Sequence, residues 1–129
     1  MALIELRFSD LVIHLREFFN IAILYIVMAL IIFDILSGIA KSWVTHEVNS
    51  TLSRKGILKH TAIIMFIIIS FPILTAIGFK SVATTIVLYL IYSYLISVIE
   101  NLTVLGVPFP KGILKRLTKL KDLIENKEE

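Results

Sequence analysis

The residues best suited to chemistry in this 129-residue sequence are polar side chains that interrupt long apolar runs. Asp34 lies inside such a run, and Gly38 and Lys41 follow it on what would be the same face of a helix. An ionisable group within a membrane-spanning helix is costly and usually faces a partner or water. Two interpretations stay open: Asp34 belongs to an oligomer contact or pore-lining face, or it reaches the lipid headgroups and pairs with Lys41.

A second set of polar residues lies along the last apolar run, where hydroxyl groups recur at steps of four from Thr85 to Ser97. Such hydroxyls hydrogen-bond neighbouring helices or line a water-filled lumen, and each bond contributes only about 0.6 kcal/mol on average in a membrane. Helix packing explains this pattern more often than a pore does. With both sets combined, the predicted oligomer-contact or pore-lining residues are Asp34, Gly38, Lys41, Tyr89, Ser93, Ser97, Glu100 and Asn101.

Catalytic chemistry finds no support in the sequence. Cysteine is absent, and His14, His46 and His60 are spaced unlike the ligands of a metal site. No glycine-rich phosphate loop occurs, and no nucleophile stands beside a plausible base. We therefore expect no catalytic, cofactor-binding or metal-binding residues, and a protein that is not an enzyme.

The elements that position these residues follow from an unusually apolar composition. Hydrophobic residues make up 57% of the sequence, against roughly 45–50% in soluble proteins. Three runs, 20–40, 61–79 and 81–99, are long enough to cross a hydrocarbon core of about 30 Å as helices. We predict a single all-α membrane domain over 1–129 with three transmembrane helices. So short a chain can enclose a pathway only as a homo-oligomer.

Basic residues predict the orientation of these spans. Of 13 lysines and arginines, ten lie in 41–60 or after residue 110, and three lie elsewhere, at Arg7, Arg16 and Lys80. The positive-inside rule then places the N-terminus outside and the C-terminus in the cytoplasm, with 41–60 as a basic cytoplasmic loop. Because the basic residues flank membrane segments, they indicate contact with anionic lipid rather than with nucleic acid.

Two flanking segments are predicted to be amphipathic helices at the membrane surface, 3–19 and 111–125. A membrane-spanning 3–19 would instead give four crossings and reverse the N-terminus. The tail follows two helix-breaking prolines, Pro108 and Pro110. Its predicted headgroup-binding residues are Lys111, Lys115, Arg116 and Lys119. Within the second span, Pro72 predicts a kink.

Four blocks of sequence carry a resemblance to a known family: residues 34–41 (DILSGIAK), 50–60 (STLSRKGILKH), 94–101 (YLISVIEN) and 105–110 (LGVPFP). In this order the sequence resembles the toxin-secretion and phage lysis holin family. That family includes holins of phages of Gram-positive hosts and clostridial toxin-release proteins. The resemblance implies a non-enzymatic protein that oligomerises in the bacterial cytoplasmic membrane and opens lesions. An endolysin or a large toxin would leave through them, without necessarily binding the protein directly.

Two alternatives to a holin remain. A small ion or metabolite channel or transporter subunit would be expected to show a mid-membrane charge, and often an inverted repeat or broken helices. Neither a repeat nor a midplane charge is evident in the sequence. An antiholin-type regulator, or an anchor that recruits a partner through its basic tail, would share the predicted topology.

Overall fold

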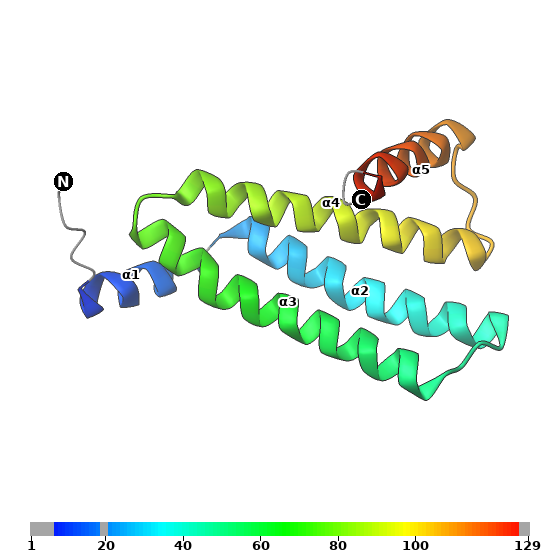
Figure 1. The fold of residues 1–129 in the computed structure, drawn as a ribbon, viewed down its shortest axis with the longest axis horizontal. Helices are drawn as coiled ribbons and strands as arrows, with labels where there is room; N and C mark the ends of the chain where they lie inside the picture. Colours follow the sequence, from blue (N-terminus) through cyan, green and yellow to red (C-terminus); the bar gives the residue numbers. More distant parts are fainter. Residues whose placement is uncertain (1–6, 19–20, 127–129) are drawn as a thin grey trace.

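The computed structural model describes residues 7–18 and 21–126, which form an all-helical structure, as predicted (Figure 1). Three of its helices are long and apolar enough to cross a membrane, namely α2, α4 and the Ser53–Ala76 part of α3. In chain order the helices are α1 (Phe8–Phe18), α2 (Ala22–Thr45), α3 (Ser50–Ala76), α4 (Lys80–Val104) and α5 (Lys111–Glu125).

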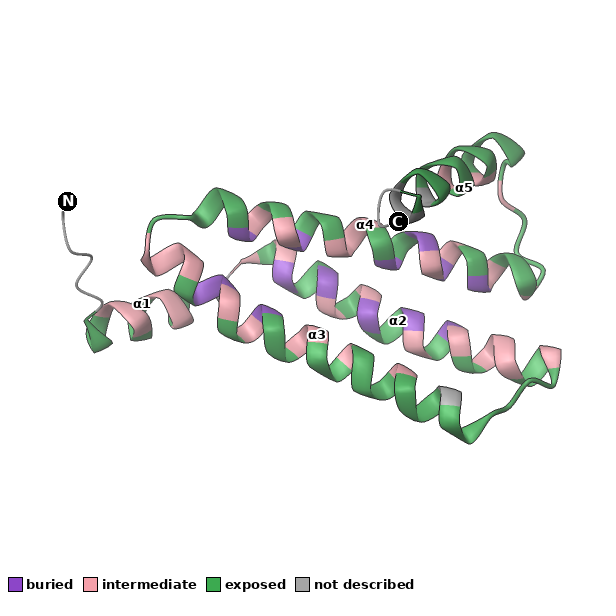
Figure 2. Cartoon of the chain, viewed as in Figure 1, coloured by how far each residue is buried: buried purple, intermediate pink, exposed green. Residues whose placement is uncertain are grey.

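The three long helices form an elongated bundle in which α2 and α4 run in the same direction and α3 runs back between their ends (Figure 1). Helix α4 packs against both α2 and α3. Figure 2 marks buried residues on each of the three long helices. The apolar core consists of Leu24, Val27, Ile31, Ile67, Phe71, Ala83, Val87 and Tyr94.

The outer faces of the bundle are also apolar, which is the pattern of a helix immersed in lipid. Large side chains such as Ile32, Leu58 and Phe66 are more than half exposed in a single chain. In water this surface would be unfavourable, because burial of apolar area is the main favourable term in folding. A bilayer or further copies of the chain would cover it.

The helices extend beyond the predicted spans at the end of the bundle that holds the polar residues. Helix α2 continues to Thr45 and α3 already begins at Ser50, so that only 46–49 of the segment 41–60 is not helical. Asn49 starts α3 by accepting a hydrogen bond from the backbone N–H of Thr51 at 2.9 Å. Hydropathy marks the part of a helix that suits lipid, whereas capping groups decide where the helix begins.

The turn between α3 and α4 depends on Gly78, which has a φ of +89°. This left-handed conformation strains residues with a Cβ atom. Helix α3, which contains the second predicted span, therefore ends at Ala76, three residues before the predicted boundary at 79.

The flanking helices are shorter than the three spans. Helix α1 has 11 residues and contacts α3, and it is too short to cross about 30 Å of hydrocarbon. Residues 3–6 and 19 of the predicted segment 3–19 lie outside the described residues. Helix α5 matches the predicted 111–125, and the chain reverses between α4 and α5 so that α5 points back along the bundle (Figure 1).

Candidate functional site: a buried polar cluster

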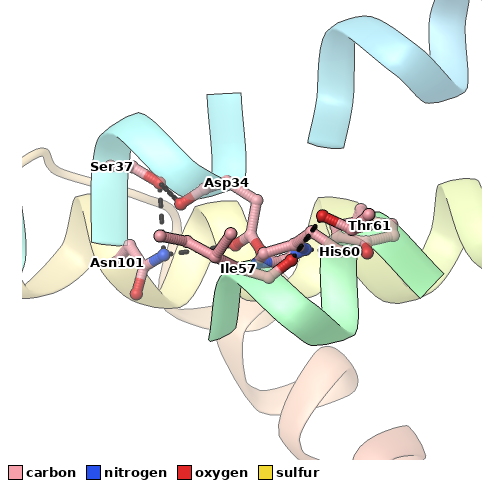
Figure 3. A network of polar contacts seen from close by, with 7 residues as sticks. Asp34, Ser37, Ile57, His60, Thr61 and Asn101 are labelled. Carbon is pink, nitrogen blue, oxygen red and sulfur yellow. Dashed lines mark hydrogen bonds and ion pairs between the residues drawn. The ribbon is translucent and has the colours of Figure 1, made fainter. Parts of the chain in front are cut away.

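Five polar side chains from three different helices meet inside the apolar bundle, and Figure 3 labels four of them, Asp34, Ser37, His60 and Asn101. We call this group the polar cluster; its members are Asp34, Ser37, His60, Tyr94 and Asn101. The side-chain amide of Asn101 connects α4 to α2, because Nδ2 lies 3.3 Å from Asp34 Oδ1 and 3.1 Å from Ser37 Oγ. Ser37 Oγ in turn donates to the backbone carbonyl of Asp34 at 3.2 Å.

His60 connects α3 to both neighbouring helices. Its Nε2 lies 3.7 Å from Asp34 Oδ2 on α2, and its Nδ1 lies 3.0 Å from the hydroxyl of Tyr94 on α4. The His60 and Tyr94 rings are also in contact, with centroids 5.6 Å apart. The imidazole therefore bridges all three long helices.

The polar cluster is shielded from solvent. Asp34 is only 8% exposed, Ser37 4% and Asn101 9%. A buried carboxylate is tolerated only where hydrogen-bond donors or opposite charge offset the lost hydration. The amide of Asn101 and the imidazole of His60 supply these partners, so the cluster specifies how the three helices meet.

A cavity of about 480 Å³ adjoins the polar cluster on the side of the 46–49 turn. At roughly 30 Å³ per water molecule, a space of this size holds on the order of ten waters. Gly38 and Gly56 also line it; a Cβ on Gly56 would meet nothing within 4 Å, and one on Gly38 would lie 3.7 Å from Asn101 Nδ2. The polar residues of its lining are Asp34, Lys41, Ser42, Thr45, Glu47, Asn49, Ser53, His60, Ser97 and Asn101.

The predicted site residues separate into two groups. Asp34, Gly38, Lys41, Ser97 and Asn101 all line the cavity. Tyr89, Ser93 and Glu100 lie instead on the exposed face of α4.

The geometry of an α-helix explains this division. A helix has about 3.6 residues per turn, so positions four apart drift around its axis. Of the hydroxyl-bearing residues spaced four apart from Thr85 to Ser97, only Ser97 therefore lines the cavity. Contact of either group with another copy or with a lumen stays a prediction.

His60 and Tyr94 were not among the predicted site residues. His60 is not spaced from the other histidines like a metal ligand, so the sequence assigns it no role. Tyr94 lies in an apolar stretch. The available signal was a histidine at the start of an apolar run in a chain that also has a buried aspartate, because that aspartate needs a partner. Ser37, one turn from Asp34, was likewise left unassigned.

Comparison with known proteins places these features in a family. Residues 16–122 match the bacteriophage holin family. The chain belongs to this family. An uncharacterized protein of Listeria innocua is 28% identical over 105 residues, which cover 81% of this chain and 74% of that protein. No solved structure matches the chain.

Family membership and the three apolar helices together make this a multi-pass membrane protein of the holin family. The matched region contains every residue of the polar cluster and most of α5. In this holin-family chain the basic residues Lys111, Lys115, Arg116 and Lys119 are all exposed on α5. Pro72 is buried inside α3, where it provides no backbone N–H for the helix.

A metal site would need several ligand side chains close together in the part of the chain that the structure describes. No group of three or more His, Asp or Glu side chains there could hold a metal ion. The polar cluster contains one carboxylate and one imidazole, and both already contact other side chains. Its evident role is to hold α2, α3 and α4 together.

Proposed function

We propose that this protein oligomerises in the bacterial cytoplasmic membrane and opens lesions through which an endolysin or a large toxin leaves the cytoplasm. Membership of the holin family over residues 16–122 is the observation that carries this proposal. The protein would act without catalysis, by changing how its helices associate.

The packing of a single chain supports the need for several copies. Its three long helices close on an apolar core, with Val27, Ile31 and Val87 almost completely buried. A hole that passes a folded protein must therefore be lined by many chains. The exposed apolar faces keep a single chain soluble in lipid, so assembly would depend on its concentration in the membrane.

The two groups of site residues suggest different roles in this assembly. Tyr89, Ser93 and Glu100 are exposed on α4, where a second copy could contact them. Asp34 and Asn101 face inward and contact each other. They would reach an oligomer contact or a lumen only after α2, α3 and α4 separate.

We also propose that the N-terminus lies outside the membrane and the C-terminus inside. The end of α2, the start of α3 and the end of α4 lie at the same end of the bundle (Figure 1), which supports one membrane side for both basic segments. By the positive-inside rule that side is the cytoplasm.

Helices α1 and α5 would then be amphipathic helices on opposite membrane surfaces. The basic side chains of α5 would bind the anionic headgroups of the inner leaflet, at about 1 kcal/mol for each charge near the surface.

Inducible expression in a bacterial host tests this function. Membrane potential and the escape of a cytosolic reporter enzyme would be followed together after induction. Abrupt loss of the potential with release of the enzyme is the expected result. Depolarisation with the enzyme retained would contradict large lesions and favour a small channel, and no effect on either would favour an antiholin-type regulator or an anchor.

A further inference from the structure

We propose that the cavity beside the polar cluster binds a primary ammonium group, with the positive charge at Asp34 and the rest of the ligand toward the 46–49 turn. The site belongs to a single closed bundle and does not depend on lesion formation. A small amine dissolved in water and the ethanolamine headgroup of a phospholipid both carry this chemistry.

The Asp34 carboxylate has fewer hydrogen-bond donors than it can accept. It is 8% exposed and lines the cavity, and a carboxylate has about four acceptor positions. Its Oδ1 accepts from Asn101 Nδ2 at 3.3 Å (Figure 3). Its Oδ2 lies 3.7 Å from His60 Nε2, which is beyond hydrogen-bond distance. Asp34 therefore retains the capacity to accept hydrogen bonds from a ligand in the cavity.

The charges around the cavity favour a ligand with one positive charge. Asp34 and Glu47 are the acidic residues of the described lining, and Lys41 is its lysine. With the imidazole of His60 neutral, these groups sum to one negative charge. A monovalent cation would neutralise this lining, whereas an anion would double its charge. Attraction between opposite charges is stronger inside a protein than in water.

The hydroxyl groups of the lining also suit a ligand that donates hydrogen bonds. Ser42 and Thr45 each donate their hydroxyl hydrogen to a backbone carbonyl of α2, at 2.8 and 3.1 Å. Their oxygens remain as acceptors. An ammonium group has three N–H donors and no acceptor, so it matches these oxygens as well as the Asp34 carboxylate.

Apolar side chains complete the lining and distinguish a primary from a quaternary ammonium. Ile35, Ile39 and Ile57 line the cavity, and such side chains commonly contact the hydrocarbon part of a ligand. Sites for quaternary ammonium ions rely on the faces of aromatic rings. Among the described lining residues there is no Phe, Tyr or Trp. The lining therefore favours an alkyl chain that ends in a group with N–H donors.

A ligand in this cavity would stabilise the closed bundle, because all three long helices contribute to the lining. A ligand that binds only the closed form shifts the equilibrium by mass action, about 11-fold at ten times its Kd. If lesions require the helices to separate, a bound ammonium group would delay them. This consequence, unlike the site itself, rests on the proposed function.

A binding titration with n-butylammonium tests the site. The full-length chain would be held in nanodiscs of phosphatidylcholine, a lipid without a primary ammonium group, and ligand-detected NMR would give the Kd against empty nanodiscs. We expect one butylammonium for each chain. Butanol and tetramethylammonium should bind about 10- to 100-fold more weakly, because each lacks the charged N–H donors.

Two charge variants should change the affinity for butylammonium in opposite directions. Asp34→Asn keeps an oxygen for the Asn101 amide but removes the negative charge, so the Kd should rise about 10- to 100-fold. Asp122→Asn on the exposed surface of α5 is its control and should leave the Kd unchanged. Lys41→Gln removes the positive charge of the lysine in the lining, so it should bind butylammonium more tightly.

A steric variant tests the cavity without altering any charge. Gly56 lines the cavity, and a Cβ there would meet no atom within 4 Å. The side chain of Gly56→Leu should therefore occupy the cavity and abolish binding. Gly112→Leu on α5, where a Cβ also meets no atom within 4 Å, is the control and should bind normally. This pair keeps the test decisive if Asp34→Asn fails to fold.

Two results would overturn the site: no binding of butylammonium beyond that of empty nanodiscs, or an unaltered Kd in both Asp34→Asn and Gly56→Leu. Nanodiscs that also contain phosphatidylethanolamine distinguish the two sources of the ligand. A weaker apparent affinity for butylammonium there would identify the lipid headgroup as a competitor. An unchanged affinity would identify a dissolved amine as the ligand.

Dye release from liposomes separates this test from that of the proposed function. Specific binding of butylammonium by a chain that never causes leakage would count against lesion formation alone. Leakage by a chain that does not bind butylammonium would count against the ammonium site alone.

Discussion

At the scale of single residues, Asn101 is the amide that keeps the Asp34 carboxylate partnered inside the bundle. Replacing it by alanine leaves both Asp34 Oδ1 and Ser37 Oγ without that donor. We predict that Asn101→Ala lowers the free energy of unfolding by about 1–3 kcal/mol, the cost of leaving a buried polar group unpaired. Unfolding titrations in mixed micelles would measure the loss.

Thr103→Ala is the matched control for this substitution. Thr103 lies two residues further along α4 and is exposed, and its hydroxyl donates to the Ile99 carbonyl of its own helix. The control should unfold like the unsubstituted chain. Equal stability of Asn101→Ala and the control would show that the amide contributes nothing to holding α2 and α4 together.

The charges of Asp34 and Glu100 should both influence when lysis begins. Asp34→Asn weakens the attraction between α2 and α3, so we predict earlier lysis. Glu100→Gln changes the exposed face of α4, where a second copy is proposed to bind, so we predict later lysis. Culture turbidity after induction reports the onset.

Asp122→Asn on the exposed surface of α5 serves as the control for removal of a carboxylate and should not move the onset. Unchanged timing in both Asp34→Asn and Glu100→Gln would remove the assignment of these residues to oligomer or lumen contacts. The family assignment would be unaffected.

Sequence reasoning identified two of the five members of the polar cluster. Asp34 and Asn101 were predicted because a carboxylate and an amide within or beside apolar runs demand an explanation. His60, which contacts Asp34 and Tyr94, could not be placed, because it is 26 residues from Asp34 and 34 from Tyr94 along the chain. Packing between α2, α3 and α4 decides which of their faces meet. A local sequence pattern does not predict this packing.

At the scale of helices and turns, Gly78 illustrates how one residue sets the hairpin of α3 and α4. A Cβ there would meet no atom within 4 Å, so the effect of Gly78→Ala should be purely conformational. Because φ is +89°, we predict a loss of stability of roughly 1–2 kcal/mol. Gly112→Ala is the control, since Gly112 lies in helix α5 with equally open surroundings.

Alanine within a helix is favoured over glycine by about 1 kcal/mol, so Gly112→Ala should be neutral or stabilising. The same unfolding titrations would compare the two variants. Equal effects of the two substitutions would contradict a turn that depends on the left-handed conformation of Gly78.

The tail helix α5 should respond to lipid charge. A single label on Thr118→Cys in the full-length chain would report the polarity around α5 in liposomes. We predict a less polar environment with anionic lipid than with zwitterionic lipid, and loss of this difference when Lys111, Lys115, Arg116 and Lys119 are changed to glutamine.

High salt should also weaken the effect of anionic lipid on α5, because ions screen exposed charges. Lys55→Gln, which removes a basic residue from α3, is the control and should keep the response. A signal that is independent of lipid charge would contradict headgroup binding by α5.

The positions of the spans were predictable because hydropathy follows the apolar runs, but the helix ends were not. Hydropathy ends the first span at residue 40, whereas α2 continues through Lys41 to Thr45. At 77–79 the predicted span is instead too long, because apolar Ile77 and Phe79 flank Gly78 in a turn and are not helical. Caps and backbone conformation, rather than apolarity, set these boundaries.

At the scale of the whole molecule, the chain combines an apolar exterior with an enclosed polar cluster. The apolar exterior suits a bilayer, and apolar side chains of the described residues fill the core between the three long helices. In the proposed function a lesion would come from assembly, in which outward residues of α4 and then the polar cluster would meet other copies. All-helical character and three spans were predictable from composition, while the parallel pairing of α2 and α4 required the structure.

Release of a folded enzyme from liposomes tests the central claim most directly. Purified full-length protein would be added at increasing density to liposomes that contain both a small dye and a folded cytosolic enzyme. We predict that dye and enzyme escape together above a threshold density, because many chains must assemble to line the hole. Retention of the enzyme at every density, with or without release of the dye, would contradict the account.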